Sequence, residues 1–444
     1  MNKYKKNPFL LTLLSFVLLI LIGSFLLTLP IATVNDSKIS FIDSLFTATS
    51  ASCVTGLVVF DTATHWTLFG QTVIIMLIQI GGIGALTLAS YITLLSGHRV
   101  AMLEFKSLCE SILIPGGYNT RQFLSLIIKV SLSVEILCSA IMAPKFIKIF
   151  GLKRGIYNAL FHSVSAFCNA GFDLNGRASK FSSLTAYYDV PSIVFPIIFL
   201  ILFGGLGFIT WDDMFHHKFN FKKYKLQSKL ILVTSLILIL LPLSYYYFIE
   251  FSLPQWISKS QHAKFMISLF QTVTPRTAGF NTVDLNNLSD TGKVITILLM
   301  FIGGAPGSTA GGMKITTIAV LTVTLLSVFN QSDSTTCFKR VISDNVVKNA
   351  ATILLMYISF AIYGAMALSL IENIPMMTAL FETTSAIATV GLTLGITPTL
   401  HLASKIILIC FMFIGRVGSL TIVYAAINSA KSSLAYPEEN VSVG

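Results

Sequence analysis

A short glycine-ended turn recurs four times along the chain, and no other feature restricts its fold as strongly. The copies are Val54-Thr55-Gly56-Leu57, Asn169-Ala170-Gly171-Phe172, Thr277-Ala278-Gly279-Phe280 and Thr389-Val390-Gly391-Leu392. Their glycines are 115, 108 and 112 residues apart, and each follows a short amphipathic segment that lies between two long apolar segments. One such tetrapeptide is a weak signal, but four at regular spacing predict that the chain consists of four copies of one unit.

The composition shows in which solvent these units fold. Hydrophobic residues make up 54% of the chain and charged residues 11%. Apolar runs of about 20 residues recur along the whole length, which is typical of transmembrane helices. No charged block is large enough for a separate soluble domain. We therefore predict an all-α polytopic membrane protein with one membrane domain over residues 1–444. The first run, Phe9–Leu29, has the length of a span and no small-residue cleavage site after it, so we interpret it as a helix and not as a signal peptide.

Each predicted unit has the order long helix, short helix, turn and return helix. The units cover approximately residues 9–95, 123–211, 229–329 and 350–428, with a tail over 429–444. The short helices are about half as long as a bilayer crossing, so they must enter and leave the membrane on one side. They are predicted at Ile42–Ala51, Ile156–Phe167, Ala263–Thr274 and Met376–Ile387. The return helices are predicted at Leu68–Leu95, Ser192–Trp211, Gly292–Phe329 and Lys405–Asn428. Backbone turns at that depth are tolerated only where they are buried or line a water-filled cavity, which favours one central pore.

Two full spans per unit predict eight crossings, with both termini on one face of the membrane. The basic run Lys218–Lys229 and the Lys-rich N-terminus indicate that this face is cytoplasmic. Lys145, Lys148, Lys153 and Arg154 fall on the opposite, external side, so the charge bias is moderate. The net charge of +11 is spread over loops, which fits membrane orientation better than nucleic acid binding.

The turns themselves indicate a cation site that is built from backbone oxygen atoms. Glycine followed by Leu or Phe is common to the four copies, whereas the two preceding residues vary. Glycine adopts conformations that other residues avoid, so successive carbonyls can point at one axis. A ring of carbonyls replaces the hydration shell of a cation, and the C-terminal ends of the short helices add negative potential. The alternative, that each glycine only ends a helix, explains four equivalent positions less well.

These units resemble the helix–pore-loop–helix repeats of the Trk/Ktr/HKT potassium transporter superfamily, and Thr389-Val390-Gly391 resembles a potassium-channel filter. The chain is more similar to KtrB-type subunits than to the longer TrkH type. The resemblance implies K⁺ uptake across the bacterial plasma membrane and a filter glycine in each turn, where Na⁺-preferring plant relatives have a serine in the first. The implied filter, which binds K⁺ by backbone carbonyls, comprises Val54, Thr55, Gly56, Asn169, Ala170, Gly171, Thr277, Ala278, Gly279, Thr389, Val390 and Gly391.

The resemblance also implies partners. It predicts a homodimer with one pore per subunit and a cytosolic nucleotide-binding ring of the KtrA type that docks on the cytoplasmic loops, besides the surrounding membrane lipids. No cofactor is predicted. K⁺ is the transported ion. Na⁺ is either an activator or a coupled ion, and the sequence does not distinguish these roles.

A second glycine-rich element follows each turn. Its copies are Gly81-Gly82-Ile83-Gly84, Gly204-Gly205-Leu206-Gly207, Gly303-Gly304-Ala305-Pro306-Gly307 and Gly415-Arg416-Val417-Gly418. Close packing between helices explains the first two. The third continues through Ser308, Thr309, Gly311 and Gly312, which predicts a broken helix. We interpret Gly303–Gly312 as a flexible loop that obstructs the path below the filter, and the resemblance implies the same intramembrane gating loop. A simple kink is the alternative.

Arg416 stands near the middle of an otherwise apolar span. An arginine there costs about 2.5–3.5 kcal/mol on insertion scales, so it must face protein or water. It either raises an electrostatic barrier to cations or pairs with carbonyls of the Gly303–Gly312 loop, and both roles are compatible. The resemblance implies that it gates the pore together with that loop.

Other polar residues in apolar surroundings have structural interpretations. Arg276, beside a turn, is expected to point into the wall and to pair with Glu382 or Asp284. Glu135 is expected to be structural, and His162, Gln271 and Glu382 to brace the turns by hydrogen bonds. Cys53 and Cys168 are expected to be reduced, as are the other cysteines.

Two other functional classes compete with a pore. An enzyme is not predicted, because no His, Asp and Glu cluster converges within a span and no nucleotide motif is present. A Na⁺-coupled secondary potassium symporter is the stronger alternative, because broken helices also build such transporters. The four units, however, share one orientation, which favours a pore around one axis.

Overall fold

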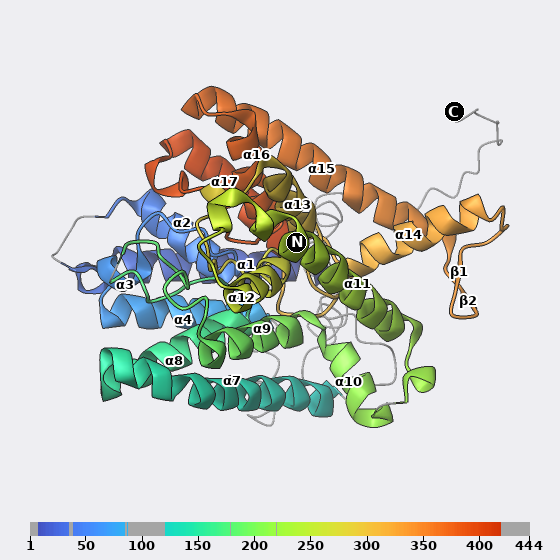
Figure 1. The fold of residues 1–444 in the computed structure, drawn as a ribbon, viewed down its shortest axis with the longest axis horizontal. Coiled ribbons are helices and arrows are strands. Elements are labelled where there is room, and N and C mark those ends of the chain that lie inside the picture. The colour runs from blue at the N-terminus through green and yellow to red at the C-terminus, as the bar shows by residue number, and fades with distance from the viewer. Residues whose placement is uncertain are drawn as a thin grey trace, which may run out of the picture.

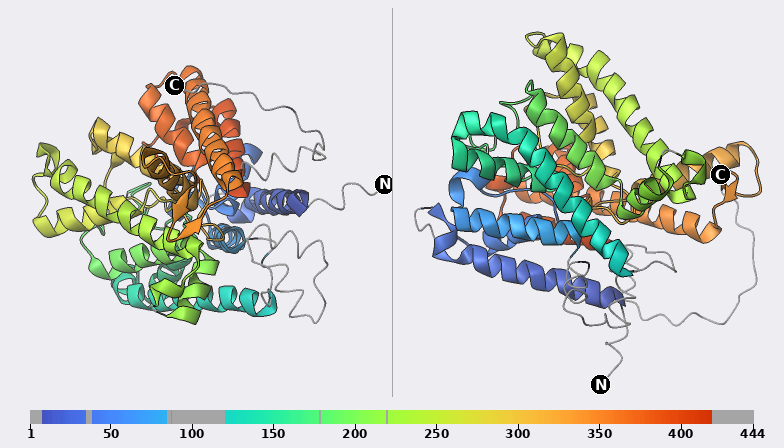
Figure 2. Two further views of the ribbon diagram at one scale, coloured as in Figure 1. Left: turned by 90° about the vertical axis from the view of Figure 1, so that its right-hand side faces the viewer. Right: turned by 90° about the horizontal axis from the view of Figure 1, so that it is seen from below.

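The computed structural model describes residues 8–34, 39–84, 87, 120–177, 179–218 and 220–418. Within these ranges the protein is helical, apart from one antiparallel hairpin of β1 (Thr336–Cys337) and β2 (Arg340–Val341). The four units form four sectors around a common centre, which the left view of Figure 2 shows as blue, green, yellow and orange to red groups of helices. The N-terminal helix and the return helix of the first unit run side by side (Figures 1 and 2).

The first helix of each unit is long and apolar. These helices are α1 (Pro8–Thr28), α7 (Thr120–Phe150), α11 (Leu226–Phe248) and α15 (Asp344–Glu372). Only 22–33% of the residues in their most apolar windows are buried inside the protein, so their remaining apolar side chains face outwards. In the described part of the chain, four helices have the length and composition to cross a membrane, or five if one bent pair counts as a span. The eight crossings stay a prediction.

The second helix of each unit is short and ends inside the protein. These helices are α2 (Phe41–Ser52), α8 (Leu152–Phe167), α12 (Gln261–Val273) and α16 (Met376–Ile387), close to the predicted bounds. Ser40 and Ser260 cap α2 and α12 by accepting backbone N–H groups. The C-terminal halves of all four are buried, so the apolar pattern at their start gives way to small and hydroxylated residues that allow close packing.

The return helices are shorter than predicted because the second glycine element ends them. They are α4 (Leu68–Ile83), α9 (Pro191–Gly205), α13 (Asp290–Phe301) and α17 (Leu402–Val417). The last glycines of three elements, Gly84, Gly207 and Gly418, have φ values of 98°, 85° and 95°, which a helix cannot contain. A continuous helix over Ser192–Trp211 is therefore wrong, since α9 breaks at Gly207 and α10 (Phe208–His217) leaves at 96°. The parts of Leu68–Leu95 and Lys405–Asn428 that lie beyond Gly84 and Gly418 are outside the described residues, apart from Thr87.

In the third unit, the segment Ile302–Lys314 separates α13 from α14 (Ile315–Phe329). The long predicted segment Gly292–Phe329 thus consists of two helices with irregular backbone between them. Short helices connect the remaining elements, and their bounds are η2 (Pro30–Ala32), α3 (Thr62–His65), η4 (Phe221–Lys223), η5 (Glu250–Ser252), η6 (Pro254–Trp256), η7 (Leu285–Asn287) and η8 (Thr397–Thr399).

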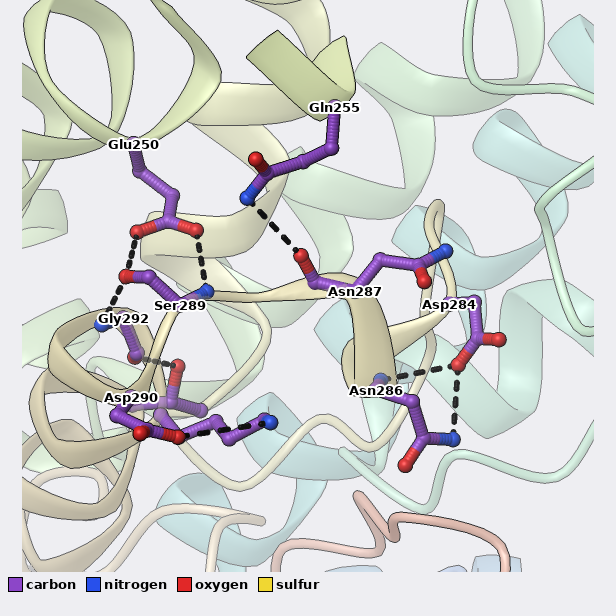
Figure 3. Close-up of polar contacts among 10 residues, drawn as sticks. Glu250, Gln255, Asp284, Asn286, Asn287, Ser289, Asp290 and Gly292 are labelled. Atoms are coloured by element: carbon purple, nitrogen blue, oxygen red, sulfur yellow. Dashed lines mark hydrogen bonds and ion pairs between the residues drawn. The ribbon is translucent and has the colours of Figure 1, made fainter. Parts of the chain in front are cut away.

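Glu250 fastens α11 to α13 and so fixes the third sector. Its fully buried carboxylate accepts hydrogen bonds from the backbone N–H of Ser289 (2.8 Å), the Ser289 hydroxyl (2.5 Å) and the Tyr245 hydroxyl (3.1 Å). Figure 3 shows the carboxylate at the start of α13, where Ser289 in turn accepts the N–H of Gly292. A carboxylate at a helix N-terminus is favourable, so Glu250 is stable here without a basic partner.

Candidate functional site

The four turns share a backbone conformation that the sequence showed only in part. Gly56, Gly171, Gly279 and Gly391 have φ values of 95°, 70°, 79° and 90°. The residue two positions earlier is also left-handed, with φ values of 57° at Val54, 58° at Asn169, 64° at Thr277 and 52° at Thr389. The residue between them has a negative φ. Left-handed conformations cost non-glycine residues about 1–2 kcal/mol each, so the surrounding structure must hold these turns in place.

The four glycines form a closed ring. A Cβ atom on Gly171 would lie 2.8 Å from the carbonyl oxygen of Ala278, and one on Gly279 would lie 2.6 Å from that of Val390. A Cβ on Gly391 would collide with the carbonyl oxygen of Thr55, and one on Gly56 would lie 2.5 Å from that of Ala170. Each turn therefore contacts the middle carbonyl of the next, in the order of units one, two, three, four and back to one. Only glycine leaves room for these contacts.

Hydrogen bonds from the short helices hold three of the turns in the same way. The backbone N–H groups of Thr55, Ala170 and Val390 each donate to a carbonyl five residues earlier at 2.8 Å. The hydroxyls of Ser50 and Ser385 accept the N–H groups of Gly56 and Gly391, each at 3.0 Å. Ser165 has the same position in the second unit, but its hydroxyl has no hydrogen-bond partner among the described residues, and Val273 replaces it in the third. Sequence reasoning missed these serines, although a serine six residues before the glycine in three units is a visible signal.

The predicted braces of the turns are confirmed for two residues. His162 Nε2 lies 3.4 Å from the backbone nitrogen of Leu174 and 3.1 Å from Asn175 Nδ2, so it ties α8 to the segment after the second turn. Glu382 accepts the hydroxyls of Thr393, at 2.7 Å, and Thr397, which follow the fourth turn. Gln271 instead lies 3.5 Å from the hydroxyl of Thr296 on α13.

Close packing of the second glycine elements is confirmed. A Cβ on Gly81, Gly204 or Gly415 would collide with the carbonyl oxygen of Ser52, Phe167 or Ile387, respectively. Each of these carbonyls belongs to the residue four positions before a turn glycine. The return helices therefore touch the ends of the short helices directly beneath the turns, and a larger residue would push the turns out of place.

The loop Ile302–Lys314 is fastened to the break between α9 and α10. Gly205 accepts the N–H of Ala305 at 2.8 Å, and Gly307 accepts the N–H of Phe208 at 2.7 Å. Across the base of the loop, the N–H of Gly303 donates to Met313 at 2.8 Å. Gly311 and Gly312 lie against Thr389 and Ala388 at the end of α16. The loop is thus an irregular segment beneath the turns, as predicted, and not a kinked helix.

Thr309 and Arg416 join the loop to three units. The Thr309 hydroxyl donates to the carbonyl of Phe167 at 2.8 Å. The Arg416 guanidinium donates to the carbonyls of Thr309 and Gly81, and to that of Gly82 at 2.9 Å. The predicted pairing of Arg416 with loop carbonyls is confirmed. A second basic side chain is bonded to the same loop: Lys314 Nζ donates to the carbonyl of Ala310 at 2.8 Å.

The predicted partner of Arg276 is wrong. Its Nη2 atom lies 3.3 Å from the hydroxyl of Ser235 on α11. Glu382 is bonded to Thr393 and Thr397, and Asp284 to Asn286. Both carboxylates accept hydrogen bonds from nearby loop residues and so are not available to Arg276.

Glu135 and the cysteines match their structural interpretations. Gln79 Nε2 lies 3.1 and 3.3 Å from the two carboxylate oxygens of Glu135. Cys53 and Cys168 are both buried and free.

Comparisons with known proteins place these features in a known group. Residues 2–434 match a family model described as TrkH: Cation transport protein. The chain is 37% identical to the Ktr system potassium uptake protein B of Bacillus subtilis over 97% of its length and 95% of the relative's. It is 35% identical to the potassium/sodium uptake protein NtpJ of Enterococcus hirae, covering 99% of this chain and 97% of that one. The fold is similar to the crystal structure of the potassium transporter TrkH from Vibrio parahaemolyticus, with a TM-score of 0.74, 21% identity and coverage of 95% of this chain and 85% of that chain.

Proposed function

We propose that this chain, which belongs to the TrkH family of cation transport proteins, takes up K⁺ through a pore whose selective part is the ring of four glycine-ended turns. The closed sequence of contacts from each turn glycine to the next middle carbonyl carries the proposal. The relatives named for potassium uptake, from Bacillus subtilis and Vibrio alginolyticus, support K⁺ as the ion.

The preference for K⁺ follows from the oxygen atoms that the four turns expose to the pore. Alternating left-handed and ordinary residues let neighbouring carbonyls face the same way, and a ring of such carbonyls replaces water around a dehydrated cation. The hydroxyls of Thr55, Thr277 and Thr389 are buried and have no hydrogen-bond partner in the part of the chain that the structure describes. Buried polar atoms normally have partners, so these hydroxyls are available to water or to an ion.

The loop and Arg416 control passage below the ring. The loop crosses beneath the turns and is bonded to units two and four, and Arg416 connects it to unit one. Arg416 adds a positive charge beside this segment, which opposes cations. Opening requires the hydrogen bonds of Thr309 and Arg416 to be exchanged for bonds to water.

We infer the membrane orientation and the assembly of this chain from its family. The chain spans the bacterial plasma membrane several times with both termini in the cytoplasm, as the basic residues of the segment 218–229 favour. The chain forms a homodimer, and a cytosolic nucleotide-binding ring of the KtrA type regulates it from the face that carries α10 and the β1–β2 hairpin. A relative named as part of a Ktr system supports a separate regulatory subunit.

Na⁺-coupled symport is the second candidate, which the potassium/sodium uptake relative favours. Uptake of ⁸⁶Rb⁺ and ²²Na⁺ into proteoliposomes separates the two. A pore is expected to accumulate Rb⁺ down an electrical gradient in the absence of Na⁺, whereas a symporter carries the two ions at a fixed ratio. The proposed function itself is tested by expressing the chain in a bacterium without K⁺ uptake systems, where growth at low K⁺ is expected to be restored. Normal surface expression without restored growth contradicts it.

Ser385→Ala is expected to lower the preference for K⁺ over Na⁺ up to about tenfold. The change leaves the buried N–H of Gly391 without its acceptor, which costs about 1–3 kcal/mol and loosens the turn. Uptake of Rb⁺ against competing Na⁺ measures the preference. Ser165→Ala is the matched control, because Ser165 has the same position but its hydroxyl makes no hydrogen bond to the described residues. Equal effects of both changes contradict the role of Ser385.

A further inference from the structure

A pocket of about 770 Å³ lies apart from the pore, between the first and second units. Its lining comes from Val34 after η2, from α3 and the start of α4, from the end of α7 and the first half of α8, and from the segment after the second turn. The left end of Figure 1 shows α3 and α4 next to the ends of α7 and α8. This is the side of the protein at which the short helices begin, which is the outer side in the membrane orientation proposed above.

Three basic side chains line the pocket, and the carboxylate of Asp61 lies against Gly176, the residue before Arg177. Lys153, Arg154 and Arg177 line it, and no Asp or Glu does. None of the three forms an ion pair with a carboxylate in the described part of the chain. Lys153 and Arg154 stand in the first turn of α8, which has no acidic residue. Cations at this positive end of a helix are unfavourable, whereas an anion there is stabilised by the helix and by the side chains together.

Two side-chain amides that line the pocket have atoms without a hydrogen bond to the described residues. Asn158 is 7% exposed, and its side-chain amide makes no hydrogen bond to the described residues. Gln71 is also 7% exposed, and its Nε2 atom donates to the carbonyls of Thr62 (3.3 Å) and Trp66 (3.0 Å), which leaves Oε1 without a donor. The pocket therefore offers a ligand both hydrogen-bond donors and acceptors, besides its positive charge.

The rim of the pocket is apolar and exposed. Leu68 lines it and is 65% exposed, and Leu152, at the start of α8, is also 65% exposed. Phe150 and Trp66 complete its apolar wall. Exposed apolar side chains around a basic pocket at the edge of a membrane protein fit a molecule with acyl chains and an anionic head.

We propose that this pocket binds an anionic phospholipid, with the phosphate on Lys153, Arg154 and Arg177 and the acyl chains over Leu68 and Leu152. The hydroxyls of a glycerol headgroup match the open acceptor of Gln71. The lipid also neutralises charges that otherwise repel cations near the mouth of the ring. One pocket residue, Leu174, is only three positions beyond Gly171 and is held by His162. Binding of the lipid thus explains why basic residues lie on the external side, where membrane proteins usually carry few.

Binding is measured on the purified full-length chain in detergent after removal of lipid, by thermal unfolding during titration. Phosphatidylglycerol is expected to raise the apparent melting temperature, whereas phosphatidylcholine and inorganic phosphate are not. The variant Lys153→Gln/Arg154→Gln/Arg177→Gln is expected to need about tenfold or more phosphatidylglycerol for half of the effect, because charge-assisted hydrogen bonds are lost. The control Lys145→Gln/Lys148→Gln/Lys180→Gln removes the same charge outside the pocket and is expected to behave as the parent chain.

Each other result overturns a defined part of this proposal. A pocket variant that responds as the parent does, or a control that loses the response equally, overturns the site. An equal effect of inorganic phosphate overturns the lipid and indicates a free anion. If the triple variant does not fold, Arg177→Gln alone, in an exposed loop, is expected to give a smaller shift in the same direction, and an unchanged titration then overturns the site. Thermal unfolding does not depend on transport. A failure of the lipid proposal can therefore be distinguished from a failure of the proposed pore.

Discussion

Gly56→Ser is expected to lower the preference for K⁺ over Na⁺ at least about tenfold while the chain still reaches the membrane. Gly56 has a φ of 95°, and a Cβ there would lie 2.5 Å from the carbonyl oxygen of Ala170. A side chain therefore strains its own turn and displaces the carbonyl of the next one. A non-glycine residue in this conformation costs about 1–2 kcal/mol before any collision, and 1.4 kcal/mol is a factor of ten in an equilibrium. Competition of Na⁺ with Rb⁺ uptake in proteoliposomes measures the change.

The chain has a matched control for this prediction. Gly395 has a φ of 91°, but a Cβ there meets no atom within 4 Å. Gly395→Ser therefore imposes the same backbone strain without disturbing the ring, and it is expected to keep the parent preference. Growth at low K⁺ and high Na⁺ gives a second readout. If Gly56→Ser keeps the preference of the parent chain, or if Gly395→Ser loses as much, the glycine ring is not the selective element.

Arg416→Ala is expected to increase the flux of K⁺ about tenfold or more. The change removes the positive charge beside the loop and its bonds to the carbonyls of Thr309, Gly81 and Gly82. Hydrogen bonds of a charged donor contribute about 1.5–3 kcal/mol each, so the loss of this anchor shifts the loop towards an open arrangement. The rate of Rb⁺ uptake, normalised to the amount of protein inserted, measures the effect.

Two further variants separate charge from anchoring. Arg416→Lys keeps the charge but not the planar group that reaches two units at once, so an intermediate flux is expected. Arg276→Ala removes the buried arginine that lies beside the third turn and bonds to Ser235, and it is expected to leave the flux at or below that of the parent chain. Unchanged or lower flux in Arg416→Ala at equal insertion contradicts the gate. A rise in Arg276→Ala of the same size shows that loss of any arginine in the membrane loosens the protein.

Properties that depend on local sequence were predictable. The first long helix and the short helices lie close to their predicted bounds, and α16 begins and ends where expected, because hydrophobic length and a following glycine act within a few residues. The left-handed turn glycines were predictable for the same reason. The repeated turns suggested the Trk/Ktr/HKT superfamily. The match of residues 2–434 to the TrkH cation transport family agrees with this prediction.

The partners of polar side chains were not predictable. Arg276 bonds to Ser235, and Thr309 to Phe167, over 41 and 142 positions of the sequence. The bend of 96° between α9 and α10 also depends on a distant segment, since Gly307 accepts the N–H of Phe208 where the helix breaks. Glycines in a row are compatible with either a packed straight helix or a break, and contacts from other units decide between them.

The sequence by itself determined that this chain enters a membrane as four similar units, each with a glycine-ended turn, because hydropathy and glycine conformation are local properties. Only the tertiary structure decided that the four turns close into a ring, that Arg416 joins the loop to the first unit, and that Lys153, Arg154 and Arg177 share a pocket. These contacts join residues from different units. Their geometry follows from how whole helices pack, since no residue pattern within one unit specifies its neighbour.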